Sequence, residues 1–367
     1  MGRNYLYLPA LALIGIAGAF VAINGCNNGG GGGTSAEGAK RISGAGATFP
    51  EGIISQWKQD YKTAKGVEID YEAKGSGFGI QQMSKQIVEF GCSDAPMKKE
   101  QLAAAKENGG EVVHIPITMG PIVPVYNLPG LSGTLTLNGK VLADIYMGKI
   151  KKWNDPAIKE LNKDLNLPDM EIVPVFRAEA SGTTFNFKEY LAKNSPAFKS
   201  SIGVSTEPTW SKGVGIGERG NPGVAKRVKD SPGAIGYVEL HFAKQDGLTF
   251  AAVVNKAGKA VLGNSEGCTA AAAAAMDKPQ TEEPYKLHEL TFNLIDPDGE
   301  SSYPITAISY CIFYKKQPAS TGKALAAFLR WATTDGQKSA VGLDHAPLPA
   351  ELVKKIDARL NQVEFAP

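Results

Sequence analysis

Histidine and cysteine are scarce in this chain, which limits the chemistry that it can support. The 367 residues include four His and four Cys, and no two Cys have the spacing of a metal site. None of the histidines lies near a Cys or another His in sequence; they are His114, His241, His288 and His345. Zinc sites need clustered His and Cys ligands. We therefore expect no metal site, and we expect no cofactor.

An excess of charge of one sign is also missing. There are 39 Lys and Arg against 37 Asp and Glu, a formal net charge of +2, and no block of Lys and Arg stands out. Nucleic acids and anionic membrane surfaces require a basic patch, so neither is an expected partner. Any anion site here must work through local dipoles and one or two charges.

The few thiols limit covalent cross-linking. With Cys26 assigned below to the N-terminal segment, three cysteines remain, and at most one disulfide can form among them. Cys92 and Cys311 sit in apolar surroundings, which favours buried thiols, whereas Cys268 opens an alanine-rich helix and is expected to be the most exposed. The sequence leaves open whether any of the three pair.

An apolar run opens the chain. Arg3 precedes almost unbroken apolar sequence from Tyr5 to Ile23, which alone could be a signal peptide or a spanning helix. Gly25 and Cys26 follow, and then five consecutive glycines at positions 29–33. A small residue before a Cys, with a flexible stretch after it, resembles the lipobox of a bacterial lipoprotein signal.

This resemblance implies a signal peptide over residues 1–25, a lipidated Cys26, and a flexible tether over residues 26–40. Several acyl chains anchor a protein stably to a membrane, where one would be marginal. Asn24 is not the small residue usual at its position, so an uncleaved apolar anchor is the alternative. Both imply an exported protein, in the periplasm or at the cell surface, held at the membrane.

Short apolar runs alternate with amphipathic stretches along the rest of the chain. Residues 67–71 and 172–176 read as strands, and each is followed by a predicted helix. Residues 112–125 read as two extended runs broken by prolines. Repeated strand–helix alternation predicts an α/β protein with two mostly parallel sheets. The ligand of such a sheet lies beyond the carboxyl ends of its strands, where helices begin.

Three segments place a hydroxyl residue among small residues, directly before a predicted helix. They are Gly44–Phe49 with Thr48, Gly75–Gly79 with Ser76, and Ala180–Thr184 with Ser181. Such a junction offers a hydroxyl, free backbone N–H groups and the positive end of a helix dipole. One alone is an ordinary N-cap, which remains the alternative for each. Three together favour a site that surrounds a small oxyanion.

Two charged residues accompany these segments. Arg177 ends a strand four residues before Ser181, so its fork and the helix N-terminus can hold the same oxyanion, with Glu179 orienting the guanidinium. The alternative is a surface ion pair. Asp94 can accept a hydrogen bond from a proton-bearing anion and so reject one without a proton. Its alternative role is to cap the helix that follows.

The segment Gly215–Gly220 matches the dinucleotide fingerprint G-x-G-x-x-G. That motif needs a buried strand before it, and residues 206–212 are polar and interrupted by a proline. We therefore expect a glycine-rich loop here and not a nucleotide site.

Taken together, these motifs resemble those of the phosphate-binding lipoproteins of bacterial high-affinity phosphate ABC transporters. The resemblance covers residues 42–348 and rests on six segments: Gly44–Pro50, Gly75–Gly77, Phe90–Pro96, Asp144–Trp153, Arg177 with Ser181–Thr183, and Pro232–Val238. It implies an α/β, type II periplasmic-binding-protein fold, with two α/β lobes, a central cleft and two crossover strands. By resemblance, phosphate is contacted by Thr48, Phe49, Ser76, Asp94, Arg177, Ser181, Gly182 and Thr183.

The sequence departs from the family pattern at Glu179, where Asp is usual, and at Phe78, where a smaller residue is common. The matched positions imply a first lobe of residues 41–117 plus 306–367 and a second lobe of residues 118–305. The crossings would lie near 117–120 and 304–305.

The resulting hypothesis is high-affinity binding of inorganic phosphate by a monomer and its delivery to the permease subunits of an ABC importer, without enzymatic activity. A cell-surface phosphate sensor or adhesin is one alternative. A phosphate-releasing hydrolase is another, because buried hydroxyls at helix starts could be nucleophiles. No general base stands beside Thr48, Ser76 or Ser181 in sequence, which argues against the hydrolase.

Overall fold

The structure is a computed structural model that describes residues 39–367. Its strands are β1 (Arg41–Gly46), β2 (Glu68–Ala73), β3 (Phe90–Ser93), β4 (Val112–Tyr126), β5 (Thr136–Leu137), β6 (Val173–Arg177), β7 (Ile216–Glu218), β8 (Ala234–Glu239), β9 (Thr249–Phe250), β10 (Ala252–Val254), β11 (Ala260–Val261), β12 (Thr306–Tyr314), β13 (Lys316–Pro318) and β14 (Glu364–Ala366). Its α-helices are α1 (Glu51–Lys65), α2 (Ser76–Ser84), α3 (Lys99–Gly109), α4 (Gly139–Tyr146), α5 (Pro156–Leu161), α6 (Gly182–Asn194), α7 (Pro196–Ser201), α8 (Gly220–Asp230), α9 (Leu240–Gln245), α10 (Ser265–Ala275), α11 (Ala319–Ala332) and α12 (Ala350–Leu360).

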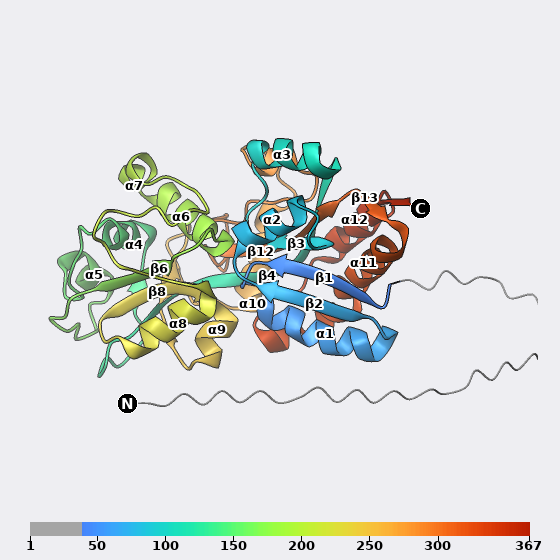
Figure 1. The fold of residues 1–367 in the computed structure, drawn as a ribbon. Helices are drawn as coiled ribbons and strands as arrows, with labels where there is room; N and C mark the ends of the chain where they lie inside the picture. The colour runs from blue at the N-terminus through green and yellow to red at the C-terminus, as the bar shows by residue number, and fades with distance from the viewer. Residues whose placement is uncertain (1–38) are drawn as a thin grey trace, which may run out of the picture. The chain divides into compact units, whose positions relative to one another are not determined.

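One continuous path of strands runs through the described residues, in the order β2-β1-β3-β12-β4-β8-β6-β7, with β9 paired to β4. In Figure 1, α2 and α6 lie above these strands and α1 and α8 below them. The predicted α/β class is confirmed. The prediction of mostly parallel strands holds at the two ends of the path only, because β12 and β4 run antiparallel to their neighbours.

Strand β4 is a single strand of 15 residues, all of them buried, where the sequence predicted two runs broken by prolines. It pairs with β12 up to Pro121 and with β8 from Ile122 onward. Proline is tolerated at bulges, where it breaks no regular ladder bond. The register of β4 against β12 shifts beside Pro116, because Tyr310 pairs with Pro116 and Ser309 with Thr118. The bulge therefore lets the strand continue.

Two hydrophobic cores lie along this path. The first contains Trp57, Phe90 and Phe328, and the second contains Trp153 and Tyr237. Strands β4 and β12 contribute side chains to both cores, as expected for two lobes joined by crossover strands. The exact lobe boundaries stay a prediction.

Helix α10 belongs to the first core, although the predicted division assigns it to the second lobe. Its buried face includes Cys268 and Ala272, which pack in the first core. The expectation of an exposed Cys268 is wrong, because the thiol is fully buried and accepts a hydrogen bond from the Thr306 hydroxyl at 3.5 Å. Because the alanine side chains are small, this face of α10 packs closely against the first core, and the Cys268 thiol on the same face is buried.

The predicted signal peptide, Cys26 and most of the predicted tether lie outside the described residues. Among residues 39–367, none of the helices combines the length and the hydrophobicity that a membrane span requires.

The first core predicts a large stability effect at Trp57. This side chain is fully buried, and its Nε1 donates to the Gly336 carbonyl at 2.8 Å. Trp57→Ala leaves a cavity and an unpaired carbonyl, so the free energy of unfolding in urea should fall by about 3–5 kcal/mol. Ile87→Ala, at a side chain that is 61% exposed, should change it by less than about 0.5 kcal/mol. Equal effects of the two substitutions would contradict this description of the core.

Candidate anion-binding site

The three hydroxyl segments meet at one place, although they are far apart in sequence. Ser76 opens α2, and its Oγ accepts hydrogen bonds from the amides of Gly182, at 2.9 Å, and Asp94, at 3.3 Å. Gly182 is the first residue of α6. The starts of α2 and α6 and the end of β3 are therefore in direct contact, as the sequence predicted from strand ends and helix starts.

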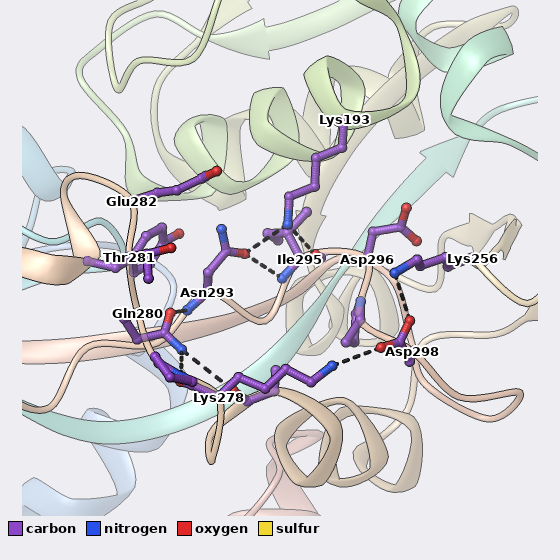
Figure 2. A pocket seen from close by; sticks show the side chains of 14 residues that line it. Lys193, Lys256, Lys278, Gln280, Thr281, Glu282, Asn293, Ile295, Asp296 and Asp298 are labelled. Carbon is purple, nitrogen blue, oxygen red and sulfur yellow. Dashed lines mark hydrogen bonds and ion pairs between the residues drawn. The ribbon is translucent and has the colours of Figure 1, made fainter.

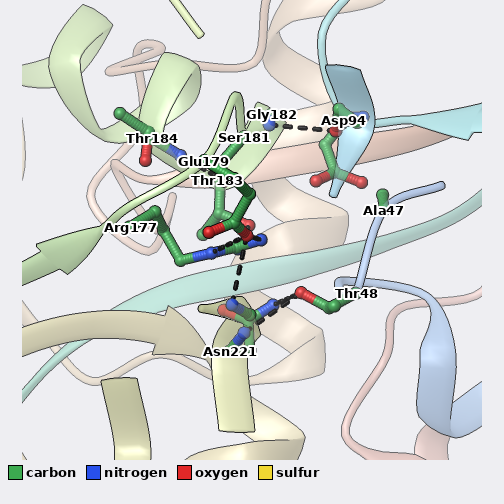
Figure 3. A network of polar contacts seen from close by, with 12 residues as sticks. Ala47, Thr48, Asp94, Arg177, Glu179, Ser181, Gly182, Thr183, Thr184 and Asn221 are labelled. Atoms are coloured by element: carbon green, nitrogen blue, oxygen red, sulfur yellow. Dashed lines mark hydrogen bonds and ion pairs between the residues drawn. The ribbon is translucent and has the colours of Figure 1, made fainter. Parts of the chain in front are cut away.

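Thr48 joins this cluster from the turn between β1 and α1 (Figure 3). Its Oγ1 accepts hydrogen bonds from the backbone N and the side-chain Nδ2 of Asn221, both at 3.1 Å. Asn221 lies in the first turn of α8 and is fully buried. The sequence analysis missed it, although Pro222 after it is a recognisable signal for a helix start.

Helix α8 begins where the sequence analysis expected a glycine-rich loop. Residues Ile216–Glu218 form β7, which pairs in parallel with β6, and α8 starts at Gly220. Gly215 has φ of 78°, and a Cβ there would lie 2.4 Å from the Pro174 carbonyl oxygen, so only glycine allows this close approach. The expectation of a loop is therefore wrong. The start of α8 belongs to the cluster around Thr48.

Ser181 is the N-cap of α6, because its Oγ accepts the Thr184 amide at 3.2 Å. Its own amide donates to the Thr206 carbonyl at 2.9 Å. A buried lysine fixes the segment that carries this carbonyl: Lys188 Nζ donates to the carbonyls of Glu207 and Thr209, at 2.8 and 2.9 Å. Burial lowers the pKa of Lys188 to about 8. Sequence reasoning missed Lys188, whose role depends on how that loop folds back over α6.

Arg177 is 1% exposed, so its pairing with Glu179 is a buried contact and not an ordinary surface ion pair. Its Nε donates to Glu179 Oε1 at 2.8 Å, its Nη2 donates to the same oxygen, and its Nη1 donates to Thr183 Oγ1 at 3.3 Å. The Gly220 amide also donates to Glu179 Oε1, at 3.1 Å. Glu179 therefore contacts the guanidinium of Arg177 and links it to the start of α8.

Asp94 is 3% exposed and does not cap the helix that follows, because α3 starts at Lys99 with Lys98 at its N-cap. Its Oδ1 accepts a hydrogen bond from the Ser309 hydroxyl at 2.9 Å. Burial raises the pKa of Asp94 to about 7, against the opposing effects of the Ser309 hydrogen bond and the Arg177 charge. The carboxyl group is therefore able to change protonation near neutral pH. No sequence signal marked Ser309, which reaches Asp94 through the pairing of β12 with β3.

Phe49 takes part in the cluster through its backbone, since its side chain is fully buried in the second core. Within residues 39–367, the amides of Thr48, Phe49 and Thr183 have no hydrogen-bond acceptor. These three donors lie at the starts of α1 and α6, where helix dipoles favour an anion. All eight predicted site residues are thus placed in, or directly beside, one buried cluster.

A hollow between α6 and α10 is lined by three lysines, Lys193, Lys256 and Lys278 (Figure 2). Lys256 and Lys278 both pair with Asp298, at 2.7 and 2.8 Å, and Lys193 donates to the Ile295 carbonyl at 2.6 Å. Asp298 therefore balances Lys256 and Lys278, and Lys193 is held by neutral oxygens. Among the described residues there is also no group of three or more His, Cys, Asp or Glu side chains that could hold a metal ion. The cluster around Asp94 and Arg177 is therefore the candidate site.

Comparison with known proteins agrees with this geometry. The chain is 42% identical to the "Phosphate-binding protein PstS" of Pasteurella multocida over 324 residues, which cover 88% of this chain and 90% of that protein. It is 40% identical to the protein of the same name from Haemophilus influenzae over 327 residues, covering 88% and 92%. A high affinity periplasmic phosphate-binding protein (PfluDING), solved with bound phosphate, has the same fold, with a TM-score of 0.70 at 18% identity over 89% of this chain and 99% of that one.

A family model described as the PBP superfamily domain matches residues 33–336. This match includes all eight predicted site residues, and the curated relatives cover most of the chain at 40% identity or more. The chain belongs to the PBP superfamily and, within it, to the PstS family of phosphate-binding proteins.

Proposed function

We propose that this protein binds inorganic phosphate between its two lobes with high affinity and delivers it to an ABC importer. The observation that carries the proposal is the buried cluster of the Arg177 guanidinium, the titratable carboxyl of Asp94 and the starts of the four helices α1, α2, α6 and α8. The names of its PstS relatives support the same ligand.

Phosphate oxygens would accept hydrogen bonds from the Arg177 fork and from the amides of Thr48, Phe49 and Thr183. Hydrogen bonds from a guanidinium or an oriented amide to an anion are charge-assisted and strong. The hydroxyls of Ser76 and Ser181 and the amide of Gly182 complete the proposed shell.

Asp94 would select which oxyanion is bound. Near neutral pH, phosphate carries a proton that the Asp94 carboxylate can accept as a hydrogen bond, whereas sulfate carries none. A bound sulfate would leave the carboxylate unpaired beside a like charge. Sites built to pair with a particular hydrogen-bonding group reject analogues that lack it by roughly 10⁴–10⁵-fold.

The proposed role is binding and not catalysis. The Oγ atoms of Thr48 and Ser76 accept hydrogen bonds from Asn221 and Gly182, which suits hydroxyls that position the site and its ligand. We further propose that the protein is an exported monomer, anchored through a lipidated Cys26, and that the permease subunits of the importer are its partners.

Calorimetry with phosphate and sulfate tests the function and the role of Asp94 together. Phosphate should bind tightly, and sulfate should bind roughly 10⁴-fold more weakly. Asp94→Asn should lose most of this discrimination, because a neutral amide does not place a like charge beside a bound sulfate. Asp230→Asn, at an exposed ion pair with Lys226, is the control and should retain it. No phosphate binding, or equal affinities for the two anions, would refute the proposed function.

Arg177 should contribute strongly to affinity. Arg177→Lys keeps the charge but removes the fork, so phosphate should bind about 10–150-fold more weakly, the equivalent of one charge-assisted hydrogen bond of about 1.5–3 kcal/mol. Arg227→Lys, at an Arg–Glu pair that is 43% exposed on the arginine side, is the matched control and should change the affinity less than twofold. Similar losses in both variants would show that the guanidinium of Arg177 has no special role.

The raised pKa of Asp94 predicts a pH-dependent stability in the absence of phosphate. Between 3.8, the unperturbed value, and about 7, the folded chain retains a proton that the unfolded chain has released. The contribution of Asp94 to the free energy of unfolding therefore falls as pH rises through this window, by at most about 4 kcal/mol. Asp94→Asn removes this effect, so urea unfolding should show the variant gaining stability over the wild type at pH 8 but not at pH 4. A difference that is constant with pH would contradict the assignment.

A further inference from the structure

Two buried thiols face each other across strands β3 and β12. Cys92 and Cys311 are directly opposite in the antiparallel register of these strands. Both are fully buried in the first core, and both are free thiols in the structure. Cys268 lies apart from them on α10, where its sulfur accepts the Thr306 hydroxyl. The structure therefore singles out one pair among the three cysteines.

Opposite residues in an antiparallel ladder form either hydrogen-bonded or non-hydrogen-bonded pairs, and Cys92 and Cys311 form a non-hydrogen-bonded pair, the kind with the shorter Cα–Cα distance. The Cys92 carbonyl accepts the Ala47 amide, which lies on the β1 side of β3. Since the N–H and C=O of one strand residue point to the same side, neither group of Cys92 is turned toward β12. Opposite residues of this non-hydrogen-bonded kind have Cα atoms about 4.5 Å apart. Disulfides span about 4.4–6.8 Å between Cα atoms, so a bond needs no movement of the strands.

Both thiols are fully buried in the folded chain, which shields them from oxidants. Burial, together with the adjacent Cys92 thiol, holds the pKa of the Cys311 thiol well above its usual value. Buried, protonated thiols react slowly with oxidants, because the thiolate is the nucleophile. A bond between these sulfurs would therefore form before β3 and β12 close over them.

We propose that Cys92 and Cys311 form a disulfide when the chain folds in the presence of a disulfide-class oxidant, either a small-molecule disulfide or a protein disulfide donor. One Cys thiolate attacks the oxidant's disulfide and releases one thiol. The other Cys thiolate then attacks the mixed disulfide and releases the second thiol. The two cysteines lose two protons and two electrons, and the oxidant is reduced to two thiols. This proposal depends on the proposed function in one respect only, namely that export of the chain would bring it into contact with such an oxidant.

This bond would adjoin the anion site. Asp94 directly follows β3, two residues after Cys92, and Ser309 lies in β12, two residues before Cys311; their side chains are hydrogen-bonded at 2.9 Å. The disulfide fixes β3 against β12 directly beside the hydrogen bond that holds Asp94. It also closes a very long loop of the chain, and long loops gain most from a cross-link in the chain-entropy description.

Peptide mapping tests the pairing. The full chain is produced in bacteria that export it, purified in detergent, alkylated under denaturing, non-reducing conditions and digested with trypsin. Cys92 then lies in peptide 86–98, Cys311 in peptide 287–315 and Cys268 in peptide 260–286, because trypsin does not cleave between Lys278 and Pro279. The first two peptides should be joined, two hydrogens lighter than their sum, and Cys268 should be alkylated. Three separately alkylated peptides, or Cys268 joined to either partner, overturn the proposal.

Melting of the same protein adds a matched control. Reduction with dithiothreitol should lower the melting temperature by roughly 5–10 °C in the wild type and in Cys268→Ala. It should not change the melting temperature of the double variant Cys92→Ala, Cys311→Ala, and an equal shift there overturns the proposal. If the double variant does not fold, the peptide map of the wild type decides alone. Phosphate calorimetry on the same samples keeps the two proposals separate, since joined peptides without phosphate binding would refute only the proposed function.

Discussion

The burial of the Arg177 guanidinium constrains the whole site. Moving a charge out of water costs several kcal/mol unless the charge is paired and its donors are satisfied. Glu179 accepts two of the donors of Arg177, and Thr183 accepts a third. Because Glu179 also accepts the Gly220 amide, the group that neutralises Arg177 fixes the start of α8 as well. The starts of α6 and α8 are therefore positioned by one ion pair.

This pairing also determines how the site can attract an anion. Glu179 already balances Arg177, and Asp94 adds a second carboxyl nearby, so the cluster carries little net positive charge of its own. The attraction must then come from oriented backbone donors at helix starts, namely the amides of Thr48, Phe49 and Thr183, which have no acceptor within residues 39–367. A site that binds its ligand mainly through hydrogen bonds, and less through charge, distinguishes one anion from another by the positions of their donors and acceptors. This explains how a chain with a formal net charge of +2 can be a specific anion receptor.

The sequence predicted the parts of this site that depend on local chemistry. Glycine-flanked hydroxyls at helix starts, and an Arg at a strand end, are recognisable because capping and strand-end geometry involve neighbouring residues. Asn221 and Ser309 were not predictable in this way. Ser309 reaches Asp94 only because β12 pairs with β3, and Asn221 reaches Thr48 only because α8 follows a strand that pairs with β6. The unbroken β4 and the buried Cys268 escaped prediction for a similar reason, since a bulge and a helix–core contact are set by distant partners.

Several hydrogen bonds connect the predicted lobes among the described residues, including those of Thr48 Oγ1 with Asn221, Ser76 Oγ with the Gly182 amide, and the Gly77 amide with the Ala180 carbonyl. Each is a bond between uncharged groups, with a net contribution of about 0.5–1.5 kcal/mol. None of these bonds on its own commits much free energy to the arrangement in which the lobes are together. An anion held between the same helix starts adds charge-assisted bonds, which are roughly twice as strong and need donors from both lobes at once. Under the proposed function, a form with the lobes apart would lack one of these two sets of donors, so the anion would bind the closed form better and shift the population toward closure.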